Sequence, residues 1–229
     1  MRRLAIITAR GGSKRIPRKN IKEFCGKPII AYSIEAALES GAFDEVMVST
    51  DDKEIAEVAL AYGAKVPFYR SEATSNDYAT TNDVLAEELR EYEKRGEKFD
   101  AFCCMYPTAP FLKAERLKTA MELLESSDAD KVFPVVAFSF PPQRAVVVRE
   151  GRLEFQYLEY MYARSQDLEK QYHDAGQFYC FKTAAFFEHE FWTGKILPLE
   201  LSELEVQDID NEADWKIAEM KWQISHKRM

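Results

Sequence analysis

The 229-residue sequence holds few cysteines and histidines, and their spacing matches no metal-binding or redox motif. The four cysteines are Cys25, Cys103, Cys104 and Cys180. They contain no C-x-x-C pair, so zinc and thioredoxin-type sites have no support. Cys103 and Cys104 stand inside an apolar run, and we expect them to be buried free thiols. Free thiols are typical of a reducing compartment, so we expect a cytoplasmic protein.

Long hydrophobic runs are also missing. No stretch is long and apolar enough to span a membrane, and the N-terminal run "LAIITA" ends at Arg10, too soon for the core of a signal peptide. The chain has 39 Asp plus Glu against 31 Lys plus Arg, a net charge of -8. Proteins that bind nucleic acid nonspecifically rely on basic surfaces. We therefore expect neither a membrane nor a nucleic acid as a partner.

Acidic residues are absent before Glu23, whereas basic residues gather there. They are Arg2, Arg3, Arg10, Lys14, Arg15, Arg18, Lys19 and Lys22. Most fall in or beside the segment "TARGGSKRIPRKN" (residues 8–20), which follows an apolar run of strand length. A local basic cluster in an acidic chain favours a small anion, such as a phosphate group, held at one point.

Apolar runs alternate with segments of helical spacing through the first 138 residues. We expect strands over residues 4–8, 43–50, 65–69, 99–106 and 131–138. We expect helices over residues 29–41, 51–63, 80–96 and 113–127, with Gly41 and Gly63 as stops and Asp51, Asp52, Thr80 or Thr81 as starts. This alternation predicts βαβ units and a largely parallel sheet.

The rhythm breaks after residue 140. A hairpin is expected over residues 144–160, turning at Glu150–Gly151. "GQFYCFK" (176–182) then predicts a strand, "LELSELEVQDID" (199–210) leads into another, and residues 211–227 predict a final helix. The sequence thus indicates one α/β, Rossmann-like domain over residues 1–229, with an inserted arm at about 139–172.

The segment after the first strand has the composition of a phosphate-binding loop. Gly11 and Gly12 allow backbone conformations that aim several N–H groups at an anion. Arg10 can fork two donors onto it, and Lys14 adds a point charge. Neither G-x-x-x-x-G-K-[ST] nor G-x-G-x-x-G is present, which counts against P-loop ATPases and dinucleotide-binding domains. The alternative is a solvated basic loop.

A pair of carboxylates near the C-terminus is the second chemical signal. If "VQDID" (206–210) is extended, Asp208 and Asp210 project to the same side, because side chains alternate along an extended chain. Two such oxygen ligands suit Mg²⁺, which also takes substrate phosphates as ligands. The alternative is that Asp210 caps the final helix, since "DNEADW" is a good helix start.

The stretch "IITARGGSKRIPRKN" (6–20) resembles the signature of the acylneuraminate cytidylyltransferases, the CMP-sialic acid synthetases, with Thr8 where the usual form has proline. The resemblance continues through "KPIIAYSIEAAL", "VMVSTDD", "IAEVALAYGAKVPFYR", "YPTAP" and "DID", and covers nearly the whole chain. It implies a Rossmann-like three-layer nucleotidyltransferase fold with a mostly parallel sheet and an inserted β-hairpin that serves as a dimerisation arm.

The resemblance also implies a reaction. The anomeric hydroxyl of a nine-carbon acidic sugar attacks the α-phosphate of CTP, pyrophosphate leaves and a CMP-sugar forms, with Mg²⁺ held by Asp208 and Asp210. The residues implied to bind the nucleotide are Ala9, Arg10, Gly11, Gly12, Ser13, Lys14, Lys19, Asn20, Arg70, Thr80 and Thr81. Those implied to act in catalysis are Arg10, Lys14, Asp208 and Asp210.

The segments that would contact the sugar differ from the usual sialic acid pattern. Many sialic acid-activating relatives have Gln where this chain has Tyr106, and "SFPPQRA" (139–145) and residues 164–179 resemble the pseudaminic acid cytidylyltransferase branch. Candidate sugar contacts are Tyr106, Arg144, Arg164, Gln166, His173, Asp174, Gln177 and Tyr179. Simple solvation of each arginine and a structural hydrogen bond of His173 are the alternatives. Sialic, legionaminic and 3-deoxy-manno-octulosonic acids remain alternative substrates, and a nucleotide-binding protein without turnover is the alternative function.

Aromatic residues concentrate in the arm and just beyond it, between Phe138 and Tyr179. A hairpin of this kind rarely buries its apolar face alone, and the resemblance implies a homodimer in which one subunit's arm reaches the other's active site. The alternative is an arm folded back on its own domain.

Overall fold

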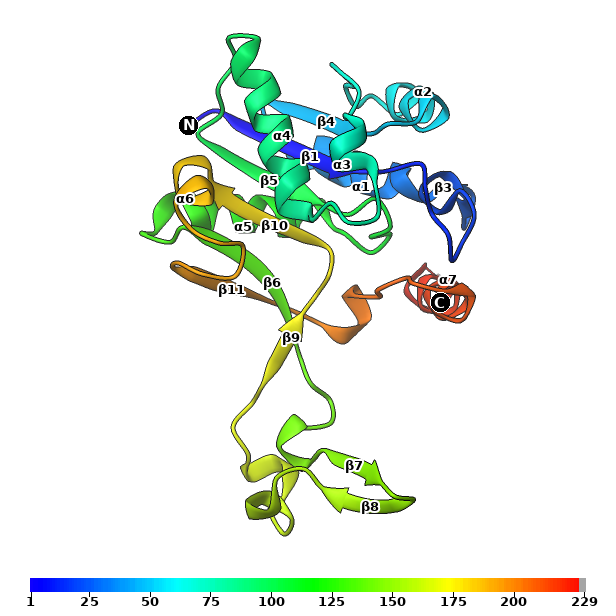
Figure 1. Cartoon of the computed structure of the whole chain (residues 1–229), viewed down its shortest axis with the longest axis vertical. Helices are drawn as coiled ribbons and strands as arrows, with labels where there is room; N and C mark the ends of the chain where they lie inside the picture. The colour runs from blue at the N-terminus through cyan, green and yellow to red at the C-terminus, as the bar shows by residue number, and fades with distance from the viewer. Residues whose placement is uncertain (227–229) are drawn as a thin grey trace.

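A seven-stranded mixed sheet with helices on both faces forms the body of the protein (Figure 1). The structure is a computed structural model, and it describes residues 1–226. The strand order is β11 (Ile196–Leu201), β6 (Lys131–Ala137), β10 (Phe178–Lys182), β5 (Ala101–Met105), β1 (Arg3–Thr8) and β4 (Glu45–Ser49), with β9 (Tyr172–Asp174) paired to β6. β10 and β9 pair antiparallel to their neighbours, and the pairs β1–β4, β1–β5 and β6–β11 are parallel. The prediction of a largely parallel α/β sheet is confirmed.

Alternation along β1 divides the core into two layers. Ala5 and Ile7 pack in a cluster with residues of α1, α2 and α5, whereas Leu4 and Ile6 pack in a second cluster with residues of α4 and α6. The helices are α1 (Ile29–Ser40), α2 (Lys53–Ala61), α3 (Glu72–Ser75), α4 (Thr81–Lys94), α5 (Ala114–Ser126), α6 (Thr183–Glu188) and α7 (Glu212–His226). Within residues 1–226, no helix combines the length and apolar character needed to cross a membrane.

The helix boundaries follow the local chemistry of the sequence. Gly41 ends α1 in the left-handed conformation, at φ 59°. Asp52 caps α2 by accepting the N–H groups of residues 54 and 55, and Thr80 opens α4 in a capping box with Asp83. These starts and stops agree with the sequence prediction.

Two expected elements differ from the structure, and a third extends beyond the described residues. Residues 65–69 form no strand, and Lys65 makes only an isolated bridge to Met47. Pro67 has no N–H with which to continue the ladder. In the segment 199–210 the strand comes first, as β11, and a 3₁₀ helix, η5 (Glu203–Glu205), separates it from a stretch 206–210 that joins no sheet. The last residue of the expected final helix, Lys227, lies outside the described residues.

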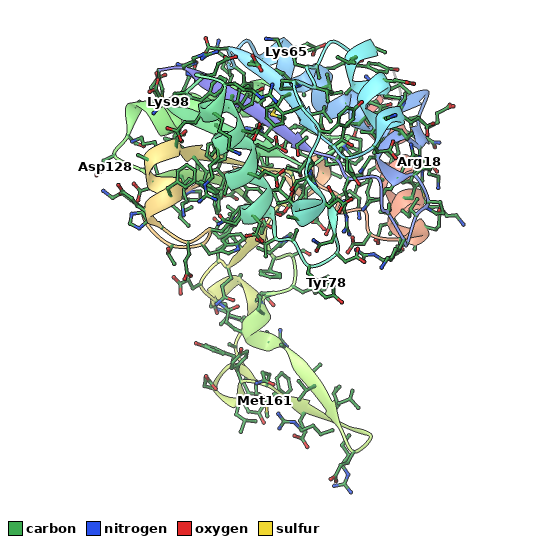
Figure 2. All side chains as sticks on the ribbon, turned by 45° about the horizontal axis from the view of Figure 1, so that its top comes forward. Arg18, Lys65, Tyr78, Lys98, Asp128 and Met161 are labelled. Carbon is green, nitrogen blue, oxygen red and sulfur yellow. The ribbon has the colours of Figure 1, made fainter. Side chains whose placement is uncertain are left out.

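An arm extends from the body between β6 and β9 (Figure 1). It contains η2 (Pro142–Arg144), β7 (Val146–Arg149), β8 (Arg152–Phe155), η3 (Leu158–Tyr160) and η4 (Ser165–Asp167). The antiparallel pairing of β7 with β8 confirms the hairpin, whose turn residues Glu150 and Gly151 both have positive φ. Figure 2 shows Met161 in this arm, away from the rounded body.

A third hydrophobic cluster joins the two ends of the chain. Ile16 from the N-terminal loop and Phe24 pack with Ile209 and Trp215 near the C-terminus, and all four are almost fully buried. The neighbouring short elements are η1 (Lys19–Ile21), β2 (Glu23–Phe24) and β3 (Lys27–Pro28). This cluster, the terminal cluster, holds the basic loop against the segment that carries Asp208 and Asp210.

Candidate active site

A cavity of about 600 Å³ lies beyond the carboxyl ends of β1 and β5. This is the edge at which parallel α/β sheets bind ligands. Its lining includes ten of the sequence-predicted residues: Arg10, Ser13, Lys14, Lys19, Asn20, Arg70, Thr81, Tyr106, Asp208 and Asp210. Cations from the start of the chain and carboxylates from its end therefore meet around one space.

The glycines of the loop serve a different purpose from the one expected. Neither Gly11 nor Gly12 has a positive φ, and the Gly11 N–H donates to Asp51 Oδ1 at 2.9 Å rather than pointing free into the cavity. A Cβ on Gly11 would lie 2.8 Å from Asp52 Oδ2, whereas one on Gly12 would meet nothing within 4 Å. A side chain at position 11 would force Asp52 to shift, which favours glycine there.

Hydrogen bonds of two buried residues also hold the loop in place. Asn20, which is buried, donates from Nδ2 to the carbonyl of Arg10 at 2.8 Å. Ala9 is fully buried, and its N–H donates to the carbonyl of Ser49 on the neighbouring strand. These contacts fix the backbone that carries Arg10 and leave its side chain at the cavity wall.

The cations of the loop have acidic partners from later in the chain. Arg10 Nη1 lies 2.8 Å from Asp77 Oδ1, and Lys14 pairs with the other oxygen of the same carboxylate. The Lys14 ammonium, with Arg10 beside it, lowers the pKa of Asp77. The next residue, Tyr78, is 94% exposed at the rim of the body (Figure 2). A phosphate group entering the cavity would compete with Asp77 for Arg10 and Lys14.

Arg18 serves to hold the loop together. Its guanidinium forks onto Asp52 with an Nη2–Oδ1 distance of 2.9 Å and also contacts Glu54. The hydrogen bond from Arg18 lowers the pKa of Asp52 to about 2. Arg18 is not among the residues that line the cavity, so this ion pair anchors the loop to the start of α2.

Asp208 and Asp210 share one side of an extended segment. Ile209 between them is fully buried in the terminal cluster, and both carboxylates line the cavity on the opposite side. Lys19 Nζ donates to the carbonyl of Ile209 at 2.7 Å. Partial burial and repulsion from Asp210 raise the pKa of Asp208, so the pair is poised to gain from a nearby cation.

Asp210 does not cap the final helix. Asn211 Oδ1 accepts the N–H groups of residues 213 and 214, at 2.8 and 3.1 Å, and Asp214 accepts the N–H of Asn211 in return. The carboxylate of Asp210 instead contacts Arg15 Nη2 at 2.7 Å. Because Asn211 and Asp214 satisfy the helix start, both aspartates remain available as ligands.

The donor set suits magnesium. Across residues 1–226 there is no group of three or more Asp, Glu, His or Cys residues that could hold a metal ion. Two carboxylates beside a cavity that is also lined by cations fit Mg²⁺ with a phosphate ligand, since Mg²⁺ takes one or two protein carboxylates and completes its shell with water and phosphate oxygens.

Arg70, Thr81 and Tyr106 complete the wall above the sheet. Arg70 is buried, and its Nε donates to Ser49 Oγ at 2.9 Å. Thr80 lies outside the cavity lining, because its hydroxyl accepts the N–H of Asp83 as the cap of α4. Burial raises the pKa of Tyr106, so its hydroxyl stays protonated and can act as a donor.

Two of the expected sugar contacts border a second cavity of about 310 Å³, which Asp208 also lines. They are His173 and Asp174. His173 Nδ1 lies 2.8 Å from the carbonyl of Asp174, not from its carboxylate. The carboxylate instead accepts the hydroxyl of Tyr179 at 2.6 Å. Tyr179 and Gln177 are both 2% exposed, and Gln177 donates to the carbonyl of Glu205.

The remaining expected sugar contacts lie in the arm and line neither cavity. Arg144 Nη1 contacts Ser165 Oγ at 3.3 Å, and Arg164 Nε contacts Asp167 Oδ2 at 2.6 Å. Gln166 is exposed on η4. Within one subunit, the structure keeps these three residues apart from the cavity that holds the other predicted residues.

Nine cavity residues were not assigned from the sequence: Thr8, Arg15, Thr74, Asn76, Asp77, Ala79, Val84, Pro107 and Thr108. Arg15 could have been assigned to the site from its charge, because it belongs to the basic segment 8–20. Pro107 and Thr108 follow a predicted strand end, which is also a signal. Nothing in the sequence marked Asp77 as a cavity residue, because an aspartate in a polar loop is ordinarily solvated.

Comparison with known proteins gives a consistent picture. A family model described as "Cytidylyltransferase" matches residues 4–208. The chain is 44% identical to the pseudaminic acid cytidylyltransferase of Campylobacter jejuni subsp. jejuni serotype O:2, over 99% of both chains. It is 34% identical to the CMP-N,N'-diacetyllegionaminic acid synthase of Legionella pneumophila subsp. pneumophila, over 100% of both. The solved structure of a CMP:2-keto-3-deoxy-manno-octonic acid synthetase with CTP shares the fold, with a TM-score of 0.73, 18% identity and full coverage of both chains.

Proposed function

Because the chain belongs to the cytidylyltransferase family, we propose that it transfers CMP from CTP to the anomeric hydroxyl of a nonulosonic acid, with pseudaminic acid as the substrate. Pyrophosphate is the other product. The choice of sugar rests on the 44% identity to a pseudaminic acid cytidylyltransferase over nearly the full length of both chains.

One observation carries the proposal: the cavity has Arg10 and Lys14 on one wall and Asp208 and Asp210 on another. The cations can bind the β- and γ-phosphates once these replace Asp77 as their partner. Their charge then stabilises the negative charge that grows on the leaving pyrophosphate. Asn20 and the Gly11–Asp51 contact keep the loop in place, so little reorganisation is needed.

Asp208 and Asp210 are the residues that would hold Mg²⁺. When bound there, the metal supplies charge neutralisation on the phosphates and polarises the α-phosphorus. The chain's own part is to present both carboxylates on one side of a segment that Ile209 and Lys19 anchor. Arg15, which contacts Asp210 at 2.7 Å, would be a further cation beside the metal and the phosphates.

The second cavity is a suitable place for the sugar. Asp208 lines both cavities, so a sugar held by His173 and Asp174 would lie next to the nucleotide. Its volume of about 310 Å³ is at the lower end of the range for small-molecule sites. The acidic sugar also needs a cation for its carboxylate, and Arg144 and Arg164 can supply bidentate contacts if they come from a second subunit.

A homodimer would bring those arginines to the site. The arm exposes large apolar side chains, with Phe140 87%, Val148 73% and Leu153 70% exposed. Apolar residues gathered on an extended arm favour burial against a partner. We propose a second copy of the chain as that partner. The buried free thiols of Cys103, Cys104 and Cys180 fit a reducing, cytoplasmic compartment.

The test is pyrophosphate release from CTP with a panel of nine-carbon acids, with and without Mg²⁺. Turnover with pseudaminic acid that requires Mg²⁺ is the expected result. Turnover with N-acetylneuraminic or legionaminic acid but not with pseudaminic acid would replace the proposed substrate. Binding of CTP without turnover of any acid would show that the chain is a nucleotide-binding protein and not an enzyme.

A further inference from the structure

A buried chain of hydrogen bonds runs behind the cavity wall from α4 to Arg70. The carboxylate of Glu88 accepts the hydroxyl hydrogen of Ser49. Ser49 Oγ in turn accepts from Arg70 Nε at 2.9 Å, and the Ser49 carbonyl accepts from Arg70 Nη2, also at 2.9 Å. Glu88 and Ser49 are 1% and 0% exposed, so water does not interrupt this chain.

The chain restricts Arg70 but leaves part of it for a ligand. Two of its three guanidinium nitrogens are bonded to Ser49. Within residues 1–226, the third, Nη1, has no hydrogen bond to protein, and Arg70 lines the cavity. A serine hydroxyl has one hydrogen to donate. Because Glu88 takes that hydrogen, Ser49 Oγ must turn a lone pair toward Arg70.

We propose that Glu88 is a positioning residue of the nucleotide site, which through the Ser49 hydroxyl fixes the guanidinium of Arg70 on the cavity wall. This inference rests on the proposed function only for the identity of the ligand. Glu88 itself does not line the cavity and has no other hydrogen-bond partner in the described chain: its Oε2 is buried without one. Burying a carboxylate in this way is costly unless it serves a neighbouring cation.

The charge of Glu88 gives the arrangement a measurable signature. Burial raises the pKa of Glu88 to about 7, against the opposing effects of Ser49 and Arg70, while Glu87 and Glu91 on the same helix raise it further. The other charged or titratable groups facing Arg70 are Asp51 after β4 and Cys104 on β5. A bound triphosphate adds negative charge near Arg70, so it favours the protonated form of Glu88. CTP binding near neutral pH should therefore take up a proton.

The test compares CTP affinity, measured by calorimetry without sugar, across four variants. Glu88→Gln keeps an acceptor for the Ser49 hydroxyl but has no charge. Glu88→Leu removes that acceptor and so frees the Ser49 hydroxyl to rotate, whereas Ser49→Ala removes the side-chain acceptor of Arg70 Nε itself. We expect Glu88→Leu and Ser49→Ala to weaken CTP binding about tenfold, as for the loss of one charge-assisted hydrogen bond. Glu45→Gln is the matched control, since Glu45 is a buried carboxylate on β4 that pairs with Lys65 outside the cavity, and it should keep wild-type affinity.

Two readouts separate positioning from general damage. In an Arg70→Ala background, Glu88→Leu should cause no further loss of CTP affinity; the same tenfold loss there would overturn the inference. The ratio of the wild-type Kd to that of Glu88→Gln should also rise several-fold between about pH 6 and pH 8. If this ratio of dissociation constants does not change with pH and Glu88→Leu binds CTP with wild-type affinity, the inference is likewise overturned.

A third readout does not depend on CTP. The Arg70 Nε–H signal in a nitrogen-15 NMR spectrum should be protected from exchange in the wild type and lost in Ser49→Ala and Glu88→Leu. An unchanged signal in both variants would overturn the inference. If the wild type binds no CTP, the proposed function fails and this signal alone decides the role of Glu88.

Discussion

Arg15 Nη2 lies 2.7 Å from Asp210 Oδ1, which joins the basic N-terminal loop directly to the carboxylate pair at the other end of the chain. The contact is open to solvent, with the Arg15 side chain 66% exposed and that of Asp210 45% exposed. Arg15 therefore occupies one face of a carboxylate that the proposed reaction assigns to Mg²⁺. A Mg²⁺ ion bound at Asp210 would be repelled by the guanidinium beside it.

Replacing Arg15 should change the magnesium requirement. We expect Arg15→Gln to lower the Mg²⁺ concentration for half-maximal turnover by roughly two- to fivefold, since exposed ion pairs contribute little. The measurement is a Mg²⁺ titration of pyrophosphate release. Lys53→Gln removes the same charge from an exposed residue of α2 outside the cavity, so it should leave the titration midpoint unchanged. An equal shift in both variants would mean that only net charge matters.

Asp210 and its neighbour Asn211 should have separable roles. Asp210→Asn should lower turnover roughly a hundredfold or more while CTP affinity changes little, because the metal acts on the charge that develops during transfer. Asn211→Ala removes the helix cap and should cost about 1 kcal/mol of stability. Turnover, CTP binding and thermal unfolding measured on both variants test this. Equal losses of binding and turnover in Asp210→Asn would contradict the metal role.

The two loop glycines provide a matched pair. In Gly11→Ala the new Cβ meets Asp52 at 2.8 Å and disturbs its contacts with Arg18, so we expect a loss of about 1–3 kcal/mol in the free energy of unfolding. Gly12→Ala has open space around the Cβ and should change stability by less than about 0.5 kcal/mol. Urea denaturation compares them, and an equal loss in both would exclude the close approach as the cause.

Glu88 should make stability depend on pH. Its pKa is about 7 in the folded protein and about 4.3 in an unfolded chain. Between these values the folded state holds the extra proton, so the free energy of unfolding falls as pH rises and stays reduced above about pH 7. Glu88→Gln has no carboxylate to titrate at this position, so its free energy of unfolding does not fall in this way. Relative to wild type it should gain roughly 2–3 kcal/mol between pH 5 and pH 8.

Urea denaturation at both pH values measures that gain. Glu45→Gln, which removes a buried carboxylate paired with Lys65, is the control and should show no such gain. A Glu88→Gln variant whose stability follows that of the wild type from pH 5 to pH 8 would show that Glu88 is ionised at both ends of this range.

The arm should control association. Val148 and Leu153 face each other across β7 and β8 and are both largely exposed. The double variant Val148→Glu, Leu153→Glu should shift the protein from dimer to monomer in light scattering, because charges would have to be buried in the interface. Leu60→Glu adds a charge at an exposed leucine on α2 and should leave the dimer intact. A wild-type protein that is monomeric at micromolar concentration would contradict the proposed dimer.

Patterns local in the sequence predicted most of the fold. Apolar runs placed five of the strands in the main sheet, and Gly41, Asp52 and Thr80 marked helix boundaries, because caps and turns depend on a few adjacent residues. The antiparallel insertion of β10 between β5 and β6 was not predictable in this way. It depends on which strand the chain returns to after the arm, and no local pattern encodes that choice.

The residues of the candidate site likewise fall into those that the sequence predicted and those that it did not. Arg10, Lys14, Asp208 and Asp210 could be singled out because a basic loop after a strand and a paired Asp-x-Asp are unusual in the sequence, whereas Arg15 and Asp77 were not assigned. Glu88 was not, since Glu87 and Glu88 are adjacent in a charged helix and only packing determines which one is buried. Likewise, that Asn211 rather than Asp210 caps α7 follows from side-chain orientations fixed by the burial of Ile209.

The hydrogen bond from Lys19 to Ile209 spans 190 positions of the chain. During synthesis the loop that carries Arg10 and Lys14 emerges well before the segment that carries Asp208 and Asp210. The terminal cluster can form only when Ile209 and Trp215 have left the ribosome. A nascent or truncated chain would therefore carry anion-binding groups without a metal site. The order of translation delays the assembly of the site until the segment with Asp208 and Asp210 has been made.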